Sequence, residues 1–265
     1  MASERGKRWA LILGASSGFG RATAIELAGA GYDIFGVHLD RKATLPQAEA
    51  VVEAVKARGR EAIFFNVNAG EAERRGQVCG AIGERFAQDG TPGALEVMLH
   101  SLAFGTLRPY IGERAVSQAQ MEMTLDVMAH SLVYWTQEIV APGLMGEGGR
   151  VFAMTSAGGR VAWPSYGPVS AAKAALEAHV RQLALELAPR GIRVNAIEAG
   201  VTDTPALRKI PGWERLVEDG RRRNPSGRLT TPEDVARAIA ALSDERTQWM
   251  TGNVIRVDGG EAIAG

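Results

Sequence analysis

Two side chains seven positions apart, Tyr166 and Lys173, carry the clearest chemical signal in this sequence, with Ser156 upstream of them. A phenol held near an ammonium group is a hydrogen-bond donor that can stabilise negative charge on an oxygen. Such charge develops when hydride reaches a carbonyl group or a double bond conjugated to one. A positioned acid typically accelerates that step by about 10²–10⁴-fold. These residues therefore suggest a site for reduction or oxidation by hydride transfer.

Lys173 also indicates what its own partner would be. It is one of only five lysines in the chain and stands in a stretch of small apolar residues. An ammonium group in such surroundings needs a polar partner, which a cofactor ribose would supply. Seven residues are close to two helical turns, so Tyr166 and Lys173 can point to one side of a helix. Pro168 suits the first turn of that helix, so we expect Tyr166 just outside it.

A glycine-rich turn near the start of the chain offers a place for a phosphate. The segment Gly14-Ala15-Ser16-Ser17-Gly18-Phe19-Gly20 follows a short apolar run and leads into a helical pattern. Glycine permits a tight turn and a close approach of the backbone to a phosphate, and the start of the helix offers unpaired N–H groups. In a strand–turn–helix context this pattern predicts a dinucleotide site at Gly14, Ser16, Ser17, Gly18, Phe19 and Gly20.

The elements that position these residues alternate along the whole chain. The short apolar runs are predicted strands and cover residues 9–13, 34–39, 62–67, 95–99, 151–154, 192–197 and 254–257. Helical periodicity occupies 21–30, 47–58, 71–86, 125–140, 171–188 and 232–242. Strands that are apolar throughout are typical of a parallel sheet covered by helices on both faces. We therefore expect one Rossmann-like, doubly wound α/β domain, residues 1–265, with seven parallel strands and the ligand at their carboxyl ends.

Composition excludes several classes of function. The 265 residues carry 30 basic and 30 acidic side chains, so no net positive charge favours nucleic acid as a partner. Cys79 is alone and the four histidines have no metal-binding spacing, so no disulfide framework or metal site is predicted. Apolar runs are too short to span a membrane, and no apolar segment that could act as a secretory signal precedes Trp9. We expect a soluble, cytoplasmic protein.

The glycine spacing GxxxGxG, together with Gly227-Arg228, Pro232-Glu233-Asp234 and Asp258-Gly259-Gly260, resembles the short-chain dehydrogenase/reductase family over nearly the whole chain. The resemblance implies that Ser156 assists Tyr166, that Asn66 and Val67 lie around the adenine, and that Ser101 and Leu102 contact the cofactor. It further implies that Val201 and Thr204 belong to the turn that contacts the nicotinamide and pyrophosphate, and that about 205–228 cover the substrate. A homotetramer is expected on the same basis.

Three departures from the usual family pattern are similar to the enoyl-acyl-carrier-protein reductases. Val169 stands where most members have tyrosine four residues before the lysine, which leaves Tyr166 in a Tyr-x6-Lys spacing. The segment His100-Ser101-Leu102-Ala103-Phe104 replaces Asn-Asn-Ala-Gly, and Met128 falls where ketoreductases have a proton-relaying asparagine. Many enoyl reductases have a second tyrosine ten residues before the first, and Ser156 stands there instead.

The preferred nicotinamide cofactor follows from the end of the second predicted strand. A carboxylate there would bind the ribose hydroxyls of NAD and repel the extra phosphate of NADP. That position falls on His38, with Asp40 two residues later and Arg41 and Lys42 beside it. The missing carboxylate and the two cations favour NADP(H), with His38 and Arg41 near the adenosine; NAD(H) stays open.

The resemblance therefore predicts reduction of the 2,3 double bond of an enoyl thioester, with Tyr166, Lys173 and Ser156 as catalytic residues. A carbonyl or 3-oxoacyl reductase, or an alcohol dehydrogenase, on the same scaffold is the alternative. A non-catalytic dinucleotide sensor is the alternative of another class. An acyl carrier protein is a candidate partner for basic residues that could equally be a solvated helix face: Arg208, Lys209, Arg215, Arg221, Arg222 and Arg223.

Overall fold

A computed structural model describes residues 7–264. The prediction that no secretory signal precedes Trp9 rests mostly on residues 1–6, which lie outside the described residues. Seven strands form one sheet in the order β3-β2-β1-β4-β5-β6-β7, and every neighbouring pair is parallel. The strands are β1 (Trp9–Leu13), β2 (Asp33–His38), β3 (Ala62–Asn66), β4 (Leu95–His100), β5 (Arg150–Thr155), β6 (Arg193–Ala199) and β7 (Val254–Val257).

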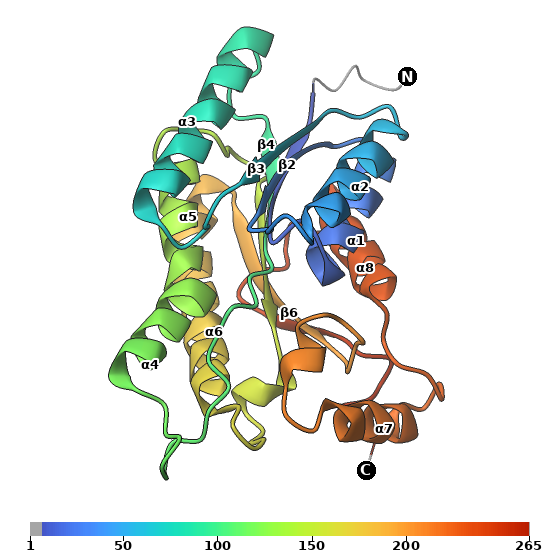
Figure 1. Ribbon diagram of the computed structural model, residues 1–265. Coiled ribbons are helices and arrows are strands. Elements are labelled where there is room, and N and C mark those ends of the chain that lie inside the picture. Colours follow the sequence, from blue (N-terminus) through green and yellow to red (C-terminus); the bar gives the residue numbers. More distant parts are fainter. Residues whose placement is uncertain (1–6, 265) are drawn as a thin grey trace.

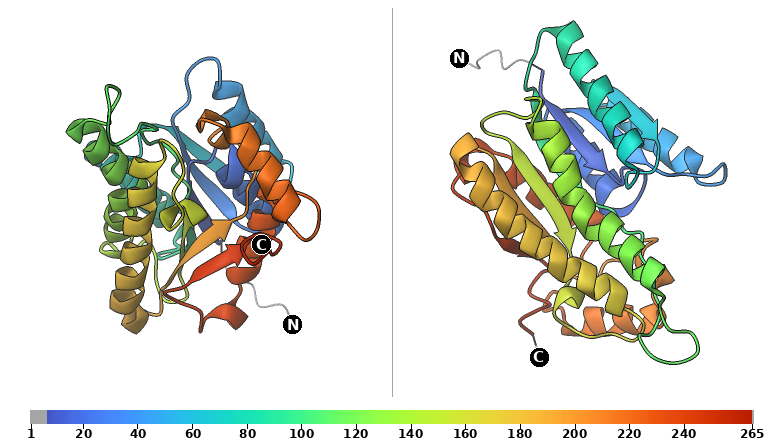
Figure 2. Two further views of the ribbon diagram at one scale, coloured as in Figure 1. Left: turned by 90° about the horizontal axis from the view of Figure 1, so that it is seen from below. Right: turned by 90° about the vertical axis from the view of Figure 1, so that its left-hand side faces the viewer.

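Helices cover both faces of this sheet, and the predicted doubly wound architecture is confirmed (Figures 1 and 2). One layer contains α1 (Gly18–Gly29), α2 (Leu45–Lys56) and α8 (Pro232–Leu242). The other contains α3 (Ala72–Asp89), α4 (Gln118–Leu125), α5 (Ser131–Val140) and α6 (Gly167–Leu187). A further helix, α7 (Trp213–Arg223), lies at the lower edge of the molecule in Figure 1, apart from both layers.

Each face of the sheet has its own apolar core, which explains why the central strand β1 is apolar at every position. Along β1, Leu11 and Leu13 pack toward α5 and α6, whereas Ala10 and Ile12 pack toward α1 and α8. All five residues of β1 are fully buried. Because a parallel strand in the middle of such a sheet meets helices on both sides, every side chain of β1 is buried whichever face it points to.

The strand order places the glycine turn where a ligand is expected to bind. Strands β1 and β4 are neighbours, and the chain leaves them to opposite helical layers, so their carboxyl ends form the switch point of the sheet. The glycine turn follows β1, and His100 ends β4. Ser156 follows β5, and Gly200 follows β6. The predicted site residues therefore meet at one edge of the sheet.

Two elements differ from the periodicity of the sequence. The helical pattern over 125–140 is the second part of a longer run in which the π-helical turn η1 (Asp126–His130) joins α4 to α5. The segment 205–228, expected as a covering stretch, contains α7. No helix within residues 7–264 is long and apolar enough to cross a membrane.

Candidate active site

The glycine turn is closely packed, and two of its glycines are required by contacts across the sheet edge. Gly14 has a φ of +90°, and a Cβ placed on it would lie 2.5 Å from the carbonyl oxygen of Ser101. A Cβ on Gly20 would overlap the carbonyl oxygen of Gly14. Any side chain at these positions would push the turn away from β4 and from its own helix, so the sequence pattern has a steric cause.

The start of α1 is free to bind an anion. Ser17 is the N-cap residue, yet its side chain makes no capping hydrogen bond to the helix. The N–H groups of the first turn and the Ser17 hydroxyl are therefore available to a phosphate, in the field of the helix dipole. Phe19, on the same turn, packs against the core below α1. The residues of this turn fit the pyrophosphate of a dinucleotide.

Thr204 lies beside Gly18, across the glycine turn. A Cβ on Gly18 would lie 3.6 Å from Cγ2 of Thr204, although the two residues are far apart in sequence. The Thr204 hydroxyl oxygen accepts a hydrogen bond from the backbone N–H of Leu207, at 3.2 Å. Its own proton remains available for donation, which agrees with the expectation that Thr204 meets the cofactor.

The loop after β2 contains a partly buried carboxylate, Asp40, two residues beyond the end of the strand. Asp40 lies 2.8 Å from Nδ1 of His38, and its backbone N–H donates to Oδ1 of Asn66. Although partial burial on its own would raise the pKa of Asp40, hydrogen bonds from Thr44, Ser16 and His38 lower it below its usual value. The carboxylate is therefore ionised at neutral pH and is bound by protein donors. Val67 donates its N–H to the carbonyl of His38, at 2.8 Å.

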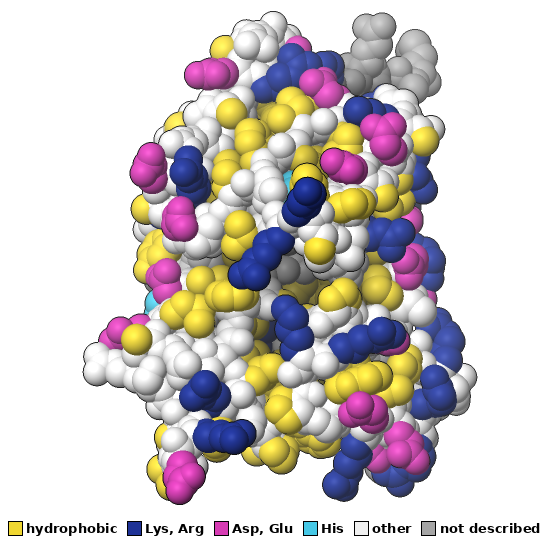
Figure 3. All heavy atoms as spheres, viewed as in Figure 1, with side chains coloured by type: hydrophobic (Ala, Val, Ile, Leu, Met, Phe, Trp, Pro, Cys, Tyr) yellow, Lys and Arg dark blue, Asp and Glu magenta, His cyan; other side chains and the backbone are white. Residues whose placement is uncertain are grey.

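The neighbouring Arg41 and Lys42 differ from Asp40 in their exposure and in their side-chain contacts. Both residues are exposed, and within residues 7–264 neither side chain has a hydrogen bond or an ion pair. Lys and Arg side chains gather around the hollowed middle of the face that contains the site (Figure 3). A positive rim of this kind attracts an anionic ligand.

Tyr166 and Ser156, the two hydroxyl groups among the catalytic candidates, lie in contact. Tyr166 is the N-cap residue of α6, just outside the helix as Pro168 predicted, and its hydroxyl is hydrogen-bonded to Ser156. Burial raises the pKa of Tyr166, and the hydrogen bond to Ser156 offsets part of that rise. The phenol therefore keeps its proton at neutral pH and is a hydrogen-bond donor. The preceding residue, Ser165, has a φ of +62°, a strained conformation for a residue with a side chain.

Lys173 reaches the same sheet edge from the second turn of α6. Its Nζ donates to the carbonyl oxygen of Met154, at 2.7 Å, and only 6% of the residue is exposed. Burial lowers the pKa of Lys173 to about 8, and the neighbouring carboxylate of Glu177 offsets part of that change. At the end of β4, burial and the charge of Lys173 lower the pKa of His100 to about 3, so this imidazole is neutral.

The predicted residues fall into three groups around one edge of the sheet. Catalytic candidates lie at β5 and α6, the phosphate turn at β1 and α1, and adenosine candidates at β2 and β3. Leu102 packs against the core beside the site, and the Ser101 carbonyl faces Gly14. Val201 differs from its expected role in one respect. Its backbone N–H is bound to Oε2 of Glu261, at 2.9 Å, and is not free for a ligand.

Sequence patterns missed two further residues of the site. Tyr110 lies against the start of α6, since a Cβ on Gly167 would be 2.5 Å from Cζ of Tyr110. Trp163 donates its indole N–H to the carbonyl of Pro211, at 3.2 Å, and so joins the loop before Tyr166 to the segment 205–228. In the sequence, only Gly167, next to Tyr166, hinted at the contact with Tyr110. No local pattern indicates the contact between Trp163 and Pro211.

Comparison with known proteins agrees with this geometry. The family model described as enoyl-(acyl carrier protein) reductase matches residues 14–261. The chain belongs to this family of short-chain dehydrogenases/reductases. The predicted family, and with it an oxidoreductase that uses a nicotinamide cofactor, is confirmed.

The relatives of this chain are named for two different reactions, reduction of enoyl and of 3-oxoacyl groups. It is 33% identical to an enoyl-(acyl-carrier-protein) reductase (NADH) of Aquifex aeolicus over 174 residues, which are 65% of this chain and 64% of that protein. The crystal structure of the enoyl reductase from Aquifex aeolicus VF5 covers 98% of both chains with a TM-score of 0.83 and 28% identity. A 3-oxoacyl-(acyl-carrier-protein) reductase of Staphylococcus aureus is 30% identical over 254 residues, 95% of this chain and 96% of that protein.

Cofactor names among the relatives also differ. An enoyl-(acyl-carrier-protein) reductase (NADPH) of Staphylococcus aureus is 34% identical over 169 residues, 63% of this chain and 65% of that protein. The sequence matches to the two enoyl reductases thus span just under two thirds of their lengths. Family membership therefore establishes the scaffold and the type of cofactor, and the substrate has to be argued from the site.

Proposed function

We propose that this protein is an NADP(H)-dependent reductase of the 2,3 double bond of enoyl thioesters. The observation that carries the proposal is the placement of the phenol. Val169, four residues before Lys173, is packed in the apolar core, whereas Tyr166 stands at the N-cap of α6 with its hydroxyl on Ser156. The acid therefore sits two turns from the lysine, the spacing of the enoyl reductases.

Each catalytic candidate has a task that its surroundings support. The nicotinamide supplies hydride. Tyr166, which keeps its proton because its pKa is raised, donates a hydrogen bond to the thioester oxygen as enolate character develops. Ser156 holds the phenol in place. Lys173, largely protonated at neutral pH, would bind the cofactor ribose.

NADP(H) is proposed as the cofactor because two exposed cations are available to bind its extra phosphate. Asp40 carries a negative charge, but hydrogen bonds from three neighbours direct it inward. Arg41 and Lys42 are exposed at the same loop, so their side chains can turn toward a ribose phosphate. Gly14, Ser17, Gly18 and Thr204 would hold the pyrophosphate.

Carbonyl reduction is the second candidate, and one observation favours it. The hydrogen bond between Ser156 and Tyr166 presents two hydroxyl groups to the same point, an arrangement that can bind a ketone oxygen. A 3-oxoacyl reductase is also among the relatives that align with nearly the whole chain.

A substrate comparison tests these candidates. The oxidation of NADPH and NADH is followed with a crotonyl thioester, an acetoacetyl thioester and a small diketone. Turnover of the crotonyl thioester supports the proposal, and turnover of only the other two would replace it by carbonyl reduction. Tight cofactor binding without any turnover would indicate a non-catalytic sensor.

An acyl carrier protein is the proposed carrier of the substrate, and α7 the proposed contact. Arg215 and Arg222 are exposed and share Asp219 on their own helix, at 3.6 and 3.1 Å. Reversal of charge at Arg221 and Arg222 should raise KM for a carrier-bound substrate and leave KM for a short free thioester unchanged. We also propose a homotetramer from the family resemblance, which sedimentation analysis tests.

A further inference from the structure

Glu261, in the segment after β7, is a buried carboxylate bound to the turn that follows β6. Its side chain is 8% exposed, and Oε2 accepts the backbone N–H of Val201, at 2.9 Å. A Cβ on Gly200 would lie 2.9 Å from the same Oε2. No side chain larger than hydrogen at position 200 would leave room for this contact. Glu261 therefore lies directly against the turn that contains Val201.

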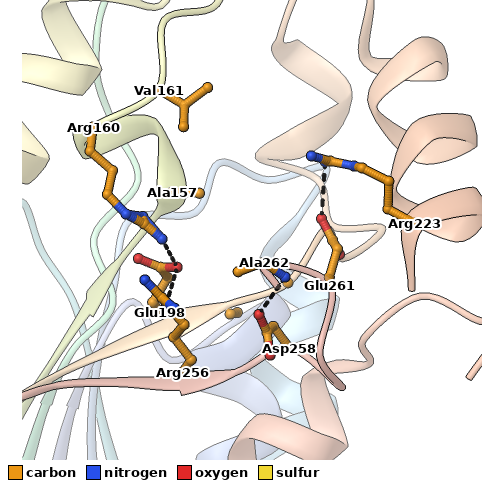
Figure 4. A pocket seen from close by; sticks show the side chains of 11 residues that line it. Ala157, Arg160, Val161, Glu198, Arg223, Arg256, Asp258, Glu261 and Ala262 are labelled. Carbon is orange, nitrogen blue, oxygen red and sulfur yellow. Dashed lines mark hydrogen bonds and ion pairs between the residues drawn. The ribbon is translucent and has the colours of Figure 1, made fainter. Parts of the chain in front are cut away.

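The other oxygen of Glu261 faces the helix α7. Oε1 lies 3.4 Å from Nη2 of Arg223, the last residue of that helix. Figure 4 shows this pair on one side of a pocket of about 270 Å³, with Arg160, Glu198 and Arg256 on the other side. The carboxylate thus contacts two segments, one oxygen for each.

The helix α7 also packs directly on the same turn. A Cβ on Gly220 would be 2.7 Å from Cβ of Val201, so helix and turn touch where the helix has no side chain. The segment 205–228, here called the lid, is held at its other end by Trp163, whose indole N–H donates to Pro211. The lid is therefore tied at one end to the loop that carries Tyr166 and at the other to Glu261, beside Asn224, whose side chain donates to the carbonyl of Asp258 at 2.9 Å.

We propose that Glu261 is a positioning residue with two roles: one carboxylate oxygen orients the Val201 turn for the cofactor, and the other holds the lid closed. This inference rests on the proposed function in one respect, that the Val201 turn contacts the nicotinamide cofactor. The two oxygens have separable tasks: Oε2 orients the turn, and Oε1 holds α7. Loss of one task should leave the other intact.

Two substitutions at one position separate these tasks. In Glu261→Gln the amide oxygen still accepts from Val201, but the ion pair with Arg223 is lost. Glu261→Ala removes both contacts. Lid opening is measured without substrate or cofactor, as the rate at which trypsin cleaves after Arg215, since cleavage inside a helix needs local unfolding. Cofactor affinity is measured by titration with NADPH and NADH.

The two variants should differ in a defined way. Glu261→Gln should speed cleavage by about 3–5-fold, as expected for a partly exposed ion pair, and leave the cofactor Kd within about twofold. Glu261→Ala should speed cleavage further and raise Kd by about 10-fold or more, because a backbone donor loses a charged acceptor. Arg223→Met, which changes a half-exposed residue, should match Glu261→Gln in both measurements.

Glu198→Gln is the matched control, because Glu198 is an equally buried glutamate of the same pocket that pairs with Arg160 and Arg256 and not with the lid. Equal acceleration of cleavage by Glu198→Gln and Glu261→Gln would overturn the proposal, since it would indicate general loosening. So would wild-type cleavage in both Glu261→Gln and Arg223→Met, or an equal rise in Kd for Glu261→Gln and Glu261→Ala. A wild-type protein that binds neither dinucleotide would refute the proposed function instead, and the cleavage rates would still report on the lid.

Discussion

Gly158 lies directly under the ring of Tyr166: a Cβ on Gly158 would overlap Cε1 of the tyrosine and stand 3.3 Å from Oγ of Ser156. The first residues after β5 therefore leave a space that the phenol ring fills. Because the partly buried ring packs there, its hydroxyl is held beside Ser156. The position of the proposed acid depends on a glycine eight residues before it.

Replacing this glycine should displace the acid without touching it. In Gly158→Ala we expect kcat to fall by about 10–100-fold, because a small misplacement of a catalytic group costs that much, with cofactor affinity unchanged. Gly159→Ala is the matched control, since a Cβ there meets only ordinary contacts of 3.4 Å or more. Steady-state kinetics of both variants checks this, and equal activity in the two would show that the ring is not placed by Gly158.

Tyr166→Phe tests the acid itself. The loss of one hydroxyl should reduce kcat by at least about 100-fold and leave the cofactor Kd within about twofold, because the phenol is needed when charge develops on the substrate oxygen. Single-turnover reduction and a fluorescence titration of the cofactor measure the two quantities. A variant of normal speed would mean that another group supplies the proton or hydrogen bond.

The buried Lys173 should make stability depend on pH in an unusual direction. Burial lowers its pKa from 10.5 to about 8, so below pH 8 both folded and unfolded chains carry the charge and the folded state bears the cost of burying it. Between pH 8 and 10.5 the unfolded chain binds more protons, and the folded state gains stability as pH rises.

The comparison with Lys173→Met isolates this effect between pH 7 and 10, where His100, whose pKa depends on the charge of Lys173, is neutral in both proteins because burial also lowers its pKa. The variant should exceed the wild type in free energy of unfolding by the largest margin below pH 8, and the margin should shrink as pH rises toward 10. Urea unfolding at several pH values measures it. A margin independent of pH would show that Lys173 titrates at its ordinary value.

The cofactor preference should depend on the two exposed cations after β2. In Arg41→Ser with Lys42→Ser, kcat/KM for NADPH should fall by about 10-fold or more, while kcat/KM for NADH changes by less than about threefold, since only NADPH offers the extra phosphate. The ratio of the two constants is the measurement. An unchanged ratio would mean that Asp40, and not the two cations, sets the cofactor preference, and it would favour NADH.

Sequence patterns alone determined the sheet and the main helices of this protein. The strand predicted over 9–13 has those bounds in the structure, and other strand limits differ by no more than two residues. These strands were predictable because an apolar run buried on two faces is typical of a parallel strand. The N-cap position of Tyr166 was predictable as well, because Pro168 is accommodated only in the first turn of a helix. The glycine turn was equally readable, because its steric demands act within one strand–turn–helix unit.

Only the tertiary structure decided which residues face one another across these elements. Gly18 meets Thr204, Ser16 and His38 meet Asp40, and Val201 meets Glu261, through the order and register of the strands. The inward turn of Asp40 shows the physical reason. Its residue type was visible, but whether the carboxylate faces solvent or protein donors depends in part on Ser16, which the turn after β1 brings to it. Local periodicity carries no information about such neighbours, so the elements were predictable and the contacts between them were not.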